Sequence, residues 1–277
     1  MFTIVHAVRP EQFEELRYSV EDGTARMRLD RPEQLNAFSS NLYGEIRWAM
    51  RAAAEDDGVD VVVITGTGRA FATGGDLKET LSRLGSDDPL SMYAFYDNLP
   101  WAAIRECPKV VVAAVNGLCL AGGLITAVCA DIAIAAESAR FGFAEGTVGI
   151  ADAMAPALLH ARVGTAKLKY LLLTGQLIDA AEAERIGLVT EVVPDDRLTA
   201  RVDEVIGELR STSPVSRSLF KQYVNEHTPL PSTHGGLPAF RSPEVIEGLR
   251  AFADRRPPDY RPAPAPADDG RDGRGTP

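Results

Sequence analysis

Cysteine and long apolar runs are scarce in this sequence, and each scarcity excludes a class of protein. The 277 residues contain three cysteines (Cys107, Cys119 and Cys129), too few for a disulfide scaffold and typical of a reducing compartment. No apolar run reaches the length of about 18 residues that a membrane-spanning helix needs. The N-terminal residues do not join a basic segment to a long apolar run, so we expect no secretory signal and a cytoplasmic protein.

Basic residues are also fewer than acidic ones in this sequence. Lys and Arg total 29 against 39 for Asp and Glu, which gives a formal net charge of −10. So acidic a chain is a poor partner for nucleic acid or an anionic membrane surface. Hydrophobic residues at 45% and charged residues at 25% are ordinary for a globular protein and exclude disorder throughout. The four histidines show no metal-binding spacing, so we expect no metal site.

Apolar bulk is nearly missing from residues 257–277, which we expect to be a disordered tail rich in proline and glycine. Three earlier runs are apolar and rich in β-branched residues: Val61–Ile64, Val110–Val115 and Ile132–Ala136. Their composition and their flanking breakers predict buried strands. The alternation over Ala25–Leu29 predicts a further strand with one exposed face.

Apolar residues at helical spacing lie between and after these runs. The predicted helices cover 42–53 (with Ser39 or Ser40 as N-cap), 123–129, 153–161, 165–173, 196–211, 214–226 and 243–254. Strands that alternate with helices predict an α/β fold. We expect one α/β core over residues 1–195 and a helical C-terminal region over 196–256.

Two glycine-bearing segments, 61–79 and 110–123, each follow a predicted strand. Glycine lets the backbone approach a ligand closely, and a glycine pair that begins a helix exposes amides where the helix dipole favours negative charge. Neither segment has the glycine spacing of a dinucleotide-binding or P-loop motif, so nucleotide binding is disfavoured. Simple tight turns between strand and helix are the alternative interpretation.

The two segments belong to a series of seven motifs that resembles the crotonase superfamily, also called the enoyl-CoA hydratase/isomerase family, from about Leu16 to Tyr260. The motifs are Leu29–Ala37, Arg69–Asp76, Ala114–Gly123, Ala130–Ile132, Ala139–Glu145, Thr174–Ala180 and Ala183–Val189. The resemblance implies the ClpP-like crotonase fold, a spiral of ββα units. It also implies that the helical C-terminal region mediates a homotrimer, or a dimer of trimers.

The resemblance implies an acyl-CoA thioester substrate, with coenzyme A as part of the substrate and no separate cofactor. Members of the family stabilise an enolate, or a related oxyanion, with two backbone amides that fall here on Gly75 and Gly122. One preorganised donor of this kind typically contributes about 100- to 1,000-fold in rate. Because the donors are backbone groups, the side chains at these positions need only be small.

The resemblance also implies a site for coenzyme A, with adenine near Thr73 and Leu77 and the phosphates near Arg31 and Ala37. A C-terminal aromatic and base of a neighbouring subunit, here Phe252 with Arg255 or Arg256, would complete it; a solvated helix end is the alternative for the two arginines. The positions expected to bind coenzyme A are Arg31, Ala37, Thr73, Asp76, Leu77, Phe252 and Arg255. The side chains of Asp76 and Asp131 are assigned to hydrogen bonds in a loop and in the core.

The proton-transfer groups differ from those of the family's hydratases. Hydratases use two glutamates, and the first of these positions is Ile125 here, which cannot carry a proton. The second position is Glu145, and one well-placed carboxylate suits the family's double-bond isomerases. Asp152 is a second candidate acid or base, and a helix N-cap is the alternative for it. The sequence therefore favours isomerisation over hydration.

Other functions stay open at this point. An atypical hydratase, another reaction of the family such as thioester hydrolysis, decarboxylation or C–C cleavage, and a binder of acyl-CoA without turnover all fit the motifs. The acyl group is expected to lie against the segment between the two glycine loops. Its aromatic and sulfur-bearing side chains are Met92, Tyr93, Phe95, Tyr96 and Trp101.

Overall fold

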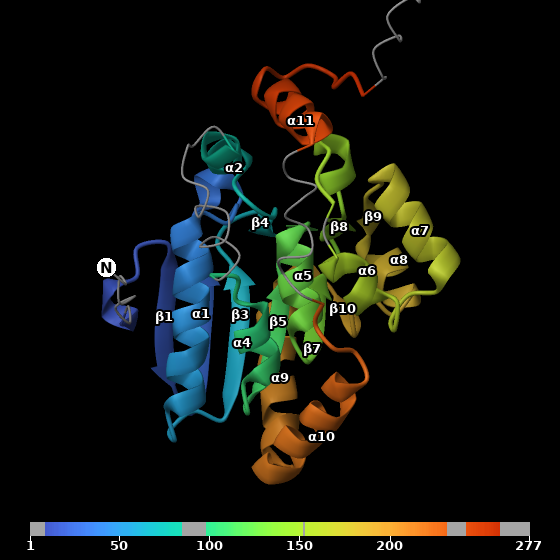
Figure 1. The fold of residues 1–277 in the computed structure, drawn as a ribbon. Helices are drawn as coiled ribbons and strands as arrows, with labels where there is room; N and C mark the ends of the chain where they lie inside the picture. Colours follow the sequence, from blue (N-terminus) through green and yellow to red (C-terminus); the bar gives the residue numbers. More distant parts are fainter. Residues whose placement is uncertain (1–8, 85–97, 152, 232–241, 261–277) are drawn as a thin grey trace, which may run out of the picture.

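The computed structural model describes residues 9–84, 98–151, 153–231 and 242–260 (Figure 1). Predictions for Asp152, for the tail over 261–277 and for residues 92–96 lie outside the described residues. The described chain is a mixed α/β structure built on two sheets.

The larger sheet forms the centre of the molecule. Its six strands lie in the order β1 (Leu16–Glu21), β2 (Thr24–Leu29), β3 (Val61–Gly66), β5 (Val110–Val115), β7 (Ile132–Ala136) and β10 (Glu191–Val193). β1 pairs with β2 antiparallel, and the other neighbours are parallel. Two of the predicted strands are confirmed with the same bounds as β5 and β7, and the predicted run Val61–Ile64 lies within β3.

A smaller sheet lies beside the first and was not predicted. It consists of β4 (Ala70–Ala72), β6 (Leu118–Leu120), β8 (Arg140–Gly142) and β9 (Ile178–Asp179), in that order. Each of β3, β5 and β7 in the larger sheet is followed by the next strand of the smaller sheet and then by helical chain. This alternation is the spiral of ββα units that the resemblance implies.

The central strands are buried on both faces, which explains their continuous apolar sequence. On β3, Val62 and Ile64 belong to one apolar cluster, and Val61 and Val63 belong to a second cluster on the other face. On β2 the pattern alternates as predicted: Ala25, Met27 and Leu29 are buried, and Arg28 is exposed.

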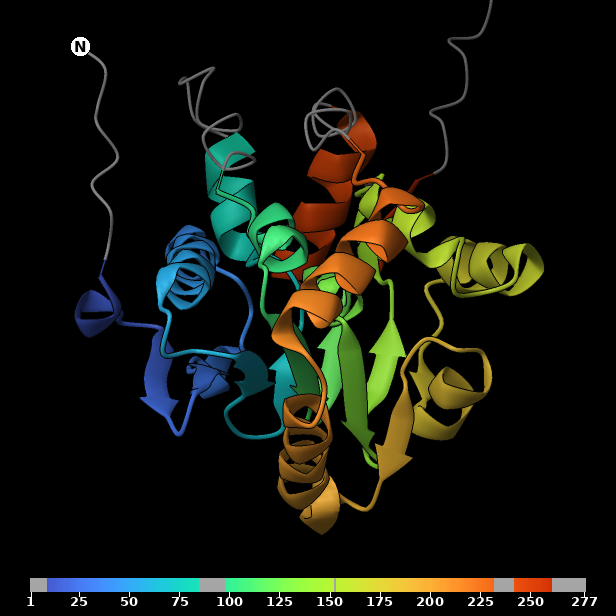
Figure 2. The ribbon, with the colours of Figure 1, turned by 90° about the horizontal axis from the view of Figure 1, so that it is seen from below.

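Helices cover both faces of the larger sheet. They are α1 (Ser40–Glu55), α2 (Leu77–Leu84), α4 (Trp101–Glu106), α5 (Gly122–Cys129), α6 (Met154–Leu159), α7 (Thr165–Thr174), α8 (Ala180–Arg185), α9 (Leu198–Arg210), α10 (Pro214–Glu226) and α11 (Pro243–Ala253). Figure 2 shows α9 on the opposite side of the sheet from α1 and α11. α11 contacts α2 and the short 3-10 helix η3 (Glu145–Val148), and these contacts bring the C-terminal region next to the glycine loops.

The C-terminal part of the chain differs in one detail from its prediction. Residues 257–260, the first four of the expected tail, are held to the fold. The Tyr260 hydroxyl donates to the Thr147 carbonyl over 2.8 Å, and the Asp259 amide donates to the Glu247 carboxylate over 3.0 Å. The division at residue 195 stays a prediction, and α9 packs directly on β5 and β7 of the core sheet.

Candidate active site

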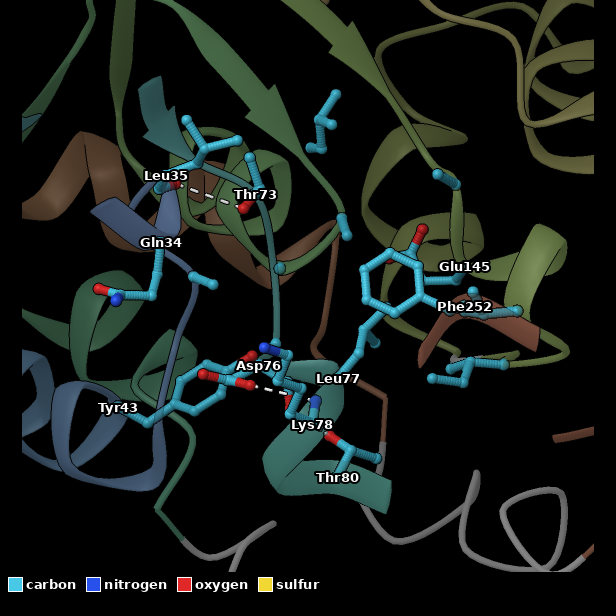
Figure 3. Close-up of a pocket in the computed structure, with 18 of the residues that line it drawn as sticks. Gln34, Leu35, Tyr43, Thr73, Asp76, Leu77, Lys78, Thr80, Glu145 and Phe252 are labelled. Atoms are coloured by element: carbon cyan, nitrogen blue, oxygen red, sulfur yellow. Dashed lines mark hydrogen bonds between the residues drawn. The ribbon is translucent and has the colours of Figure 1, made fainter. Parts of the chain in front are cut away.

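A cavity of about 590 Å³ opens where the two glycine loops meet η3 and α11 (Figure 3). Gly75, Gly122 and Glu145, three of the predicted catalytic positions, all line it. Apolar side chains form much of the remaining wall, among them Leu99, Trp101, Ile150 and Met154. The structure thus brings residues 75, 122 and 145 together in one site, as their sequence motifs predicted.

The first glycine loop follows β4 and begins α2. Its backbone pairs with Phe38, whose amide donates to the Gly74 carbonyl over 2.7 Å and whose carbonyl accepts from the Asp76 amide over 2.9 Å. In such a bridge the amide of the middle residue, here Gly75, points away from its partner strand. None of the described residues accepts a hydrogen bond from the Gly75 amide, as an amide that is to bind a ligand requires.

The second glycine loop joins β6 to α5. Ala121 adopts φ 52° and ψ −127°, a backbone conformation that residues with a Cβ rarely occupy. Gly122 is the first residue of the helix, so its amide is one of those without an intrahelical acceptor, at the positive end of the helix dipole.

The two loops touch one another. A Cβ placed on Gly74 would lie 3.1 Å from the Gly122 nitrogen and 2.5 Å from the Ala121 Cβ. Gly74 also has φ 90°, which favours glycine. Close contact between the loops keeps the Gly75 and Gly122 amides within one small region, where they can hold a single oxygen that carries negative charge.

Glu145 lies on the other side of the cavity from Tyr43 in Figure 3. It follows β8 and begins η3, and its carbonyl accepts the Ile150 amide over 2.9 Å, so the turn fixes its backbone. One carboxylate oxygen, Oε2, is buried. Glu145 is therefore a wall residue of the cavity rather than a surface carboxylate.

Ile125 occupies a different environment. It is fully buried in the main apolar cluster, one turn into α5, and is absent from the cavity wall. The described wall has two other carboxylates. Asp76 accepts the Lys78 and Glu79 amides at the start of α2, as the prediction of a loop hydrogen-bonding role requires, and Glu33 is exposed. Glu145 is thus the wall carboxylate with a buried oxygen.

Most of the positions expected to bind coenzyme A line the same cavity: Ala37, Thr73, Asp76, Leu77 and Phe252. Arg31 and Arg255 do not. The Arg31 guanidinium is held by Glu15 over 2.8 Å, by Asp76 over 3.3 Å and by the Ala37 carbonyl. Its assignment to the phosphates stays a prediction.

Phe252 lines the cavity of its own chain from α11. Its expected contribution to the site of a neighbouring subunit stays a prediction. The ring is 52% exposed, so one of its faces stays open at the cavity mouth.

Among the wall residues that sequence reasoning missed, two have side chains to which we assign a function, Lys78 and Tyr43. Lys78, on the first turn of α2, is exposed and supplies a cation at the mouth; its place directly after the Asp76 motif was the available signal. Tyr43, on α1, reaches the two glycine loops. It lies between residues that predicted a core helix face, and nothing in the sequence distinguishes it from them.

Asp131 and Cys119 both have structural roles in the interior of the fold. Asp131 accepts the Val111 amide over 2.7 Å and pairs with Lys221 over 2.8 Å. Cys119 on β6 is fully buried, and burial raises the pKa of its thiol well above the usual value. A thiol with so high a pKa stays protonated and unreactive at neutral pH.

A cavity lined by two glycine loops and by a carboxylate with a buried oxygen is the kind of site that the resemblance to the crotonase superfamily implies. A sequence model described as Enoyl-CoA hydratase/isomerase matches residues 19–262. The chain belongs to the enoyl-CoA hydratase/isomerase family.

Individual relatives agree with this assignment. A probable enoyl-CoA hydratase of Mycobacterium tuberculosis is 33% identical over 84% of this chain and 92% of its own length. A trans-2-decenoyl-[acyl-carrier-protein] isomerase of Streptococcus mutans is 31% identical over 90% and 98%. The crystal structure of an enoyl-CoA hydratase from Mycobacterium avium subsp. paratuberculosis superposes with a TM-score of 0.78 at 32% identity and covers 90% of this chain and 99% of that one.

None of the helices in the part of the chain that the structure describes is long and apolar enough to cross a membrane.

Proposed function

We propose that this protein isomerises the double bond of an enoyl-CoA, with Glu145 as the acid and base. The observation that carries the proposal is the contrast between Glu145 and Ile125. Glu145 lines the cavity with a buried carboxylate oxygen, whereas the position of the first hydratase glutamate, residue 125, holds an isoleucine in the apolar core.

The reaction follows from the groups around the cavity. The Glu145 carboxylate removes a proton from C2 of a 3-enoyl thioester, and the C–H electrons enter a dienolate. The negative charge moves to the thioester oxygen, which accepts hydrogen bonds from the Gly75 and Gly122 amides. The protonated Glu145 then returns the proton to C4, which leaves the double bond conjugated with the carbonyl.

Hydration is the second candidate, and the names of the relatives favour it. Several relatives are called probable enoyl-CoA hydratases, whereas the relative from Streptococcus mutans is called an isomerase. The two reactions are separated by supplying crotonyl-CoA, a 3-enoyl-CoA and a 3,5-dienoyl-CoA to the purified protein. Isomerisation of either of the last two, at a rate well above hydration of crotonyl-CoA, supports the proposal. Fast hydration of crotonyl-CoA overturns it, and binding without any product indicates a binder.

For the coenzyme A part of the substrate, we propose binding at the mouth of the cavity. Lys78 supplies a cation there for a phosphate, and the exposed face of Phe252 supplies an apolar surface. Since the whole reaction needs only a base, an acid and the two amides, the proposed mechanism uses no cofactor beyond the substrate's own coenzyme A.

We further propose that the chain works as a homotrimer or a dimer of trimers. Apolar side chains are exposed along α10 and near α7: Val215, Leu219, Phe220, Tyr223, Val224, Tyr170, Leu173 and Leu177. An exposed apolar surface of this kind is typical of an interface. Light scattering of the full chain tests this: a mass of three or six chains supports it, and a monomer overturns it. The free, buried cysteines fit the cytoplasm as the compartment.

A further inference from the structure

Tyr43 is the side chain that lies closest to both glycine positions at once. A Cβ placed on Gly122 would lie 2.9 Å from the Tyr43 hydroxyl oxygen, and a Cβ placed on Gly75 would lie 3.7 Å from it. Apart from Gly75 itself and its two chain neighbours, no other described residue has an atom within 4 Å of such a Cβ on Gly75. The hydroxyl therefore stands between the two residues whose amides face the cavity.

The phenol ring is fixed from two sides. The ring of Phe38 meets it edge-on with centroids 4.8 Å apart, and the ring of Trp101 meets it edge-on at 6.3 Å. Tyr43 is only 3% exposed, although it lines the cavity. A ring packed in this way delivers its hydroxyl to one place with little freedom to move, which is the property that makes a donor effective in catalysis.

The chemistry of the hydroxyl suits that place. A phenol ordinarily keeps its proton at neutral pH, so it can donate a hydrogen bond to an oxygen that carries negative charge. Hydrogen bonds from O–H to an ionised oxygen are short and roughly twice as strong as neutral ones. In the dry interior of a cavity such a bond is stronger still.

We propose that the Tyr43 hydroxyl is a third hydrogen-bond donor to the thioester oxygen of the substrate, beside the Gly75 and Gly122 amides. The inference rests on the proposed enolate chemistry and adds a side-chain donor to it. A side chain on residue 122 would press on this hydroxyl, so glycine at this position leaves the hydroxyl in its place.

The test compares Tyr43→Phe with Tyr18→Phe. The first variant removes one hydroxyl and keeps the ring that packs on Phe38 and Trp101. Tyr18 is a half-buried tyrosine on β1 that does not line the cavity, so the second variant is a matched control. Two measurements are made on each: kcat and KM for a 3-enoyl-CoA, and the isotope-edited infrared stretch of the carbonyl of a bound 2-enoyl-CoA.

We expect Tyr43→Phe to lower kcat about 10- to 100-fold, less than the about 100- to 1,000-fold known for a donor in a two-donor site. KM should change little, and the carbonyl stretch should move toward its value in free ligand. Tyr18→Phe should leave kcat and the carbonyl stretch as in the wild type. The infrared band reports only folded protein with ligand bound, so a loss of stability does not hide the result.

An unchanged carbonyl stretch in Tyr43→Phe overturns the inference, whatever the rate does, because a packing defect can lower a rate without altering the polarisation of the carbonyl. If the wild type turns over no enoyl-CoA, the proposed function fails. The carbonyl shift of the bound ligand still decides the role of Tyr43 in that case.

Discussion

The backbone of Phe38 pairs with that of Gly75, through hydrogen bonds of 2.7 Å to the Gly74 carbonyl and 2.9 Å from the Asp76 amide. The pairing joins the chain ahead of α1 to the first glycine loop. It also turns the Gly75 amide toward the cavity. Phe38 thus sets the position of one proposed oxyanion donor, the Gly75 amide, although the two residues are distant in sequence. The amide of Phe38 itself is used in the pairing.

We predict that Gly74→Ala impairs both stability and activity. Residue 74 has φ 90°, and a methyl group there would lie 2.5 Å from the Ala121 Cβ. The two loops must separate, so we expect a loss of about 1–3 kcal/mol in the free energy of unfolding and a fall of at least about 100-fold in kcat/KM. Gly207→Ala on α9 is the control, because a Cβ there meets nothing within 4 Å. Denaturant melts and steady-state rates measure both; wild-type activity in Gly74→Ala would contradict the prediction.

We predict that one of the two tryptophans reports ligand binding. Trp101 lines the cavity and is 6% exposed, so an acyl group should change its fluorescence. Trp48 lies on α1 between Arg47 and Arg51, whose guanidinium carbons are 5.4 and 5.1 Å from its ring centroid, and does not line the cavity. Titration with an acyl-CoA should therefore change the emission of Trp48→Phe and leave that of Trp101→Phe constant. The reverse pattern would mean that the acyl group binds elsewhere.

We predict that Lys78→Ala weakens binding of coenzyme A without slowing the chemical step. The ammonium sits at the cavity mouth and is exposed, so its attraction to a phosphate is screened by salt. We expect Kd to rise roughly three- to tenfold at low salt, which corresponds to about 0.7–1.4 kcal/mol, with kcat unchanged. Isothermal titration with acyl-CoA at two salt concentrations measures it. Lys169→Ala, an exposed lysine on α7, should leave Kd unaltered; equal effects of the two variants would argue against a specific contact.

We predict that Lys221→Met is destabilising, because Lys221 is the partner of a partly buried carboxylate. The side chain of Lys221 is 6% exposed, and its ammonium lies 2.8 Å from Asp131. Removing one member of a fully buried pair costs about 3–5 kcal/mol, and we expect a loss toward the lower end of that range because Asp131 is only partly buried. Lys169→Met serves as the control. The double variant Lys221→Met with Asp131→Asn should recover part of the loss in a denaturant melt.

The same pair predicts a dependence on pH. Burial raises the pKa of the Asp131 carboxyl, and the Lys221 ammonium opposes that shift. A carboxyl whose pKa is higher in the folded state binds protons more readily there, so folding is disfavoured as pH rises from the unfolded pKa through the folded one. Without the Lys221 ammonium, the pKa of the Asp131 carboxyl in the folded protein should rise further. The deficit of Lys221→Met relative to the wild type should therefore shrink as the pH is lowered, and a deficit independent of pH would show that Asp131 is not its cause.

The sequence predicted the parts of the fold whose signals are local. β5 and β7 carry continuous β-branched runs because both of their faces are buried, and α10 begins at a proline after a capping serine. The three-residue strands β4, β6 and β8 were missed because three residues are too few to show a period. These strands pair with one another because successive ββα units stack in a spiral, and no short stretch of sequence shows that arrangement.

The candidate site was predictable where its donors are glycines in motifs and unpredictable where it depends on distant partners. Gly75, Gly122 and Glu145 line one cavity, as their motifs indicated. Arg31 looked like a cation for phosphate, but Glu15, Asp76 and the Ala37 carbonyl hold its guanidinium. Those contacts link residues up to 45 positions apart, and such tertiary pairings leave no mark on local sequence.

Exchange of Glu145 for glutamine tests the central claim most directly. The measurement is the isomerisation of a 3-enoyl-CoA by Glu145→Gln, followed by proton NMR in D₂O together with a binding titration of the same ligand. A neutral amide of the same shape cannot accept the C2 proton, so turnover and deuterium uptake should both fall by about 100- to 10,000-fold. The Kd should stay within about twofold, since the coenzyme A contacts and both amides are intact. Isomerisation at the wild-type rate in Glu145→Gln would contradict the account.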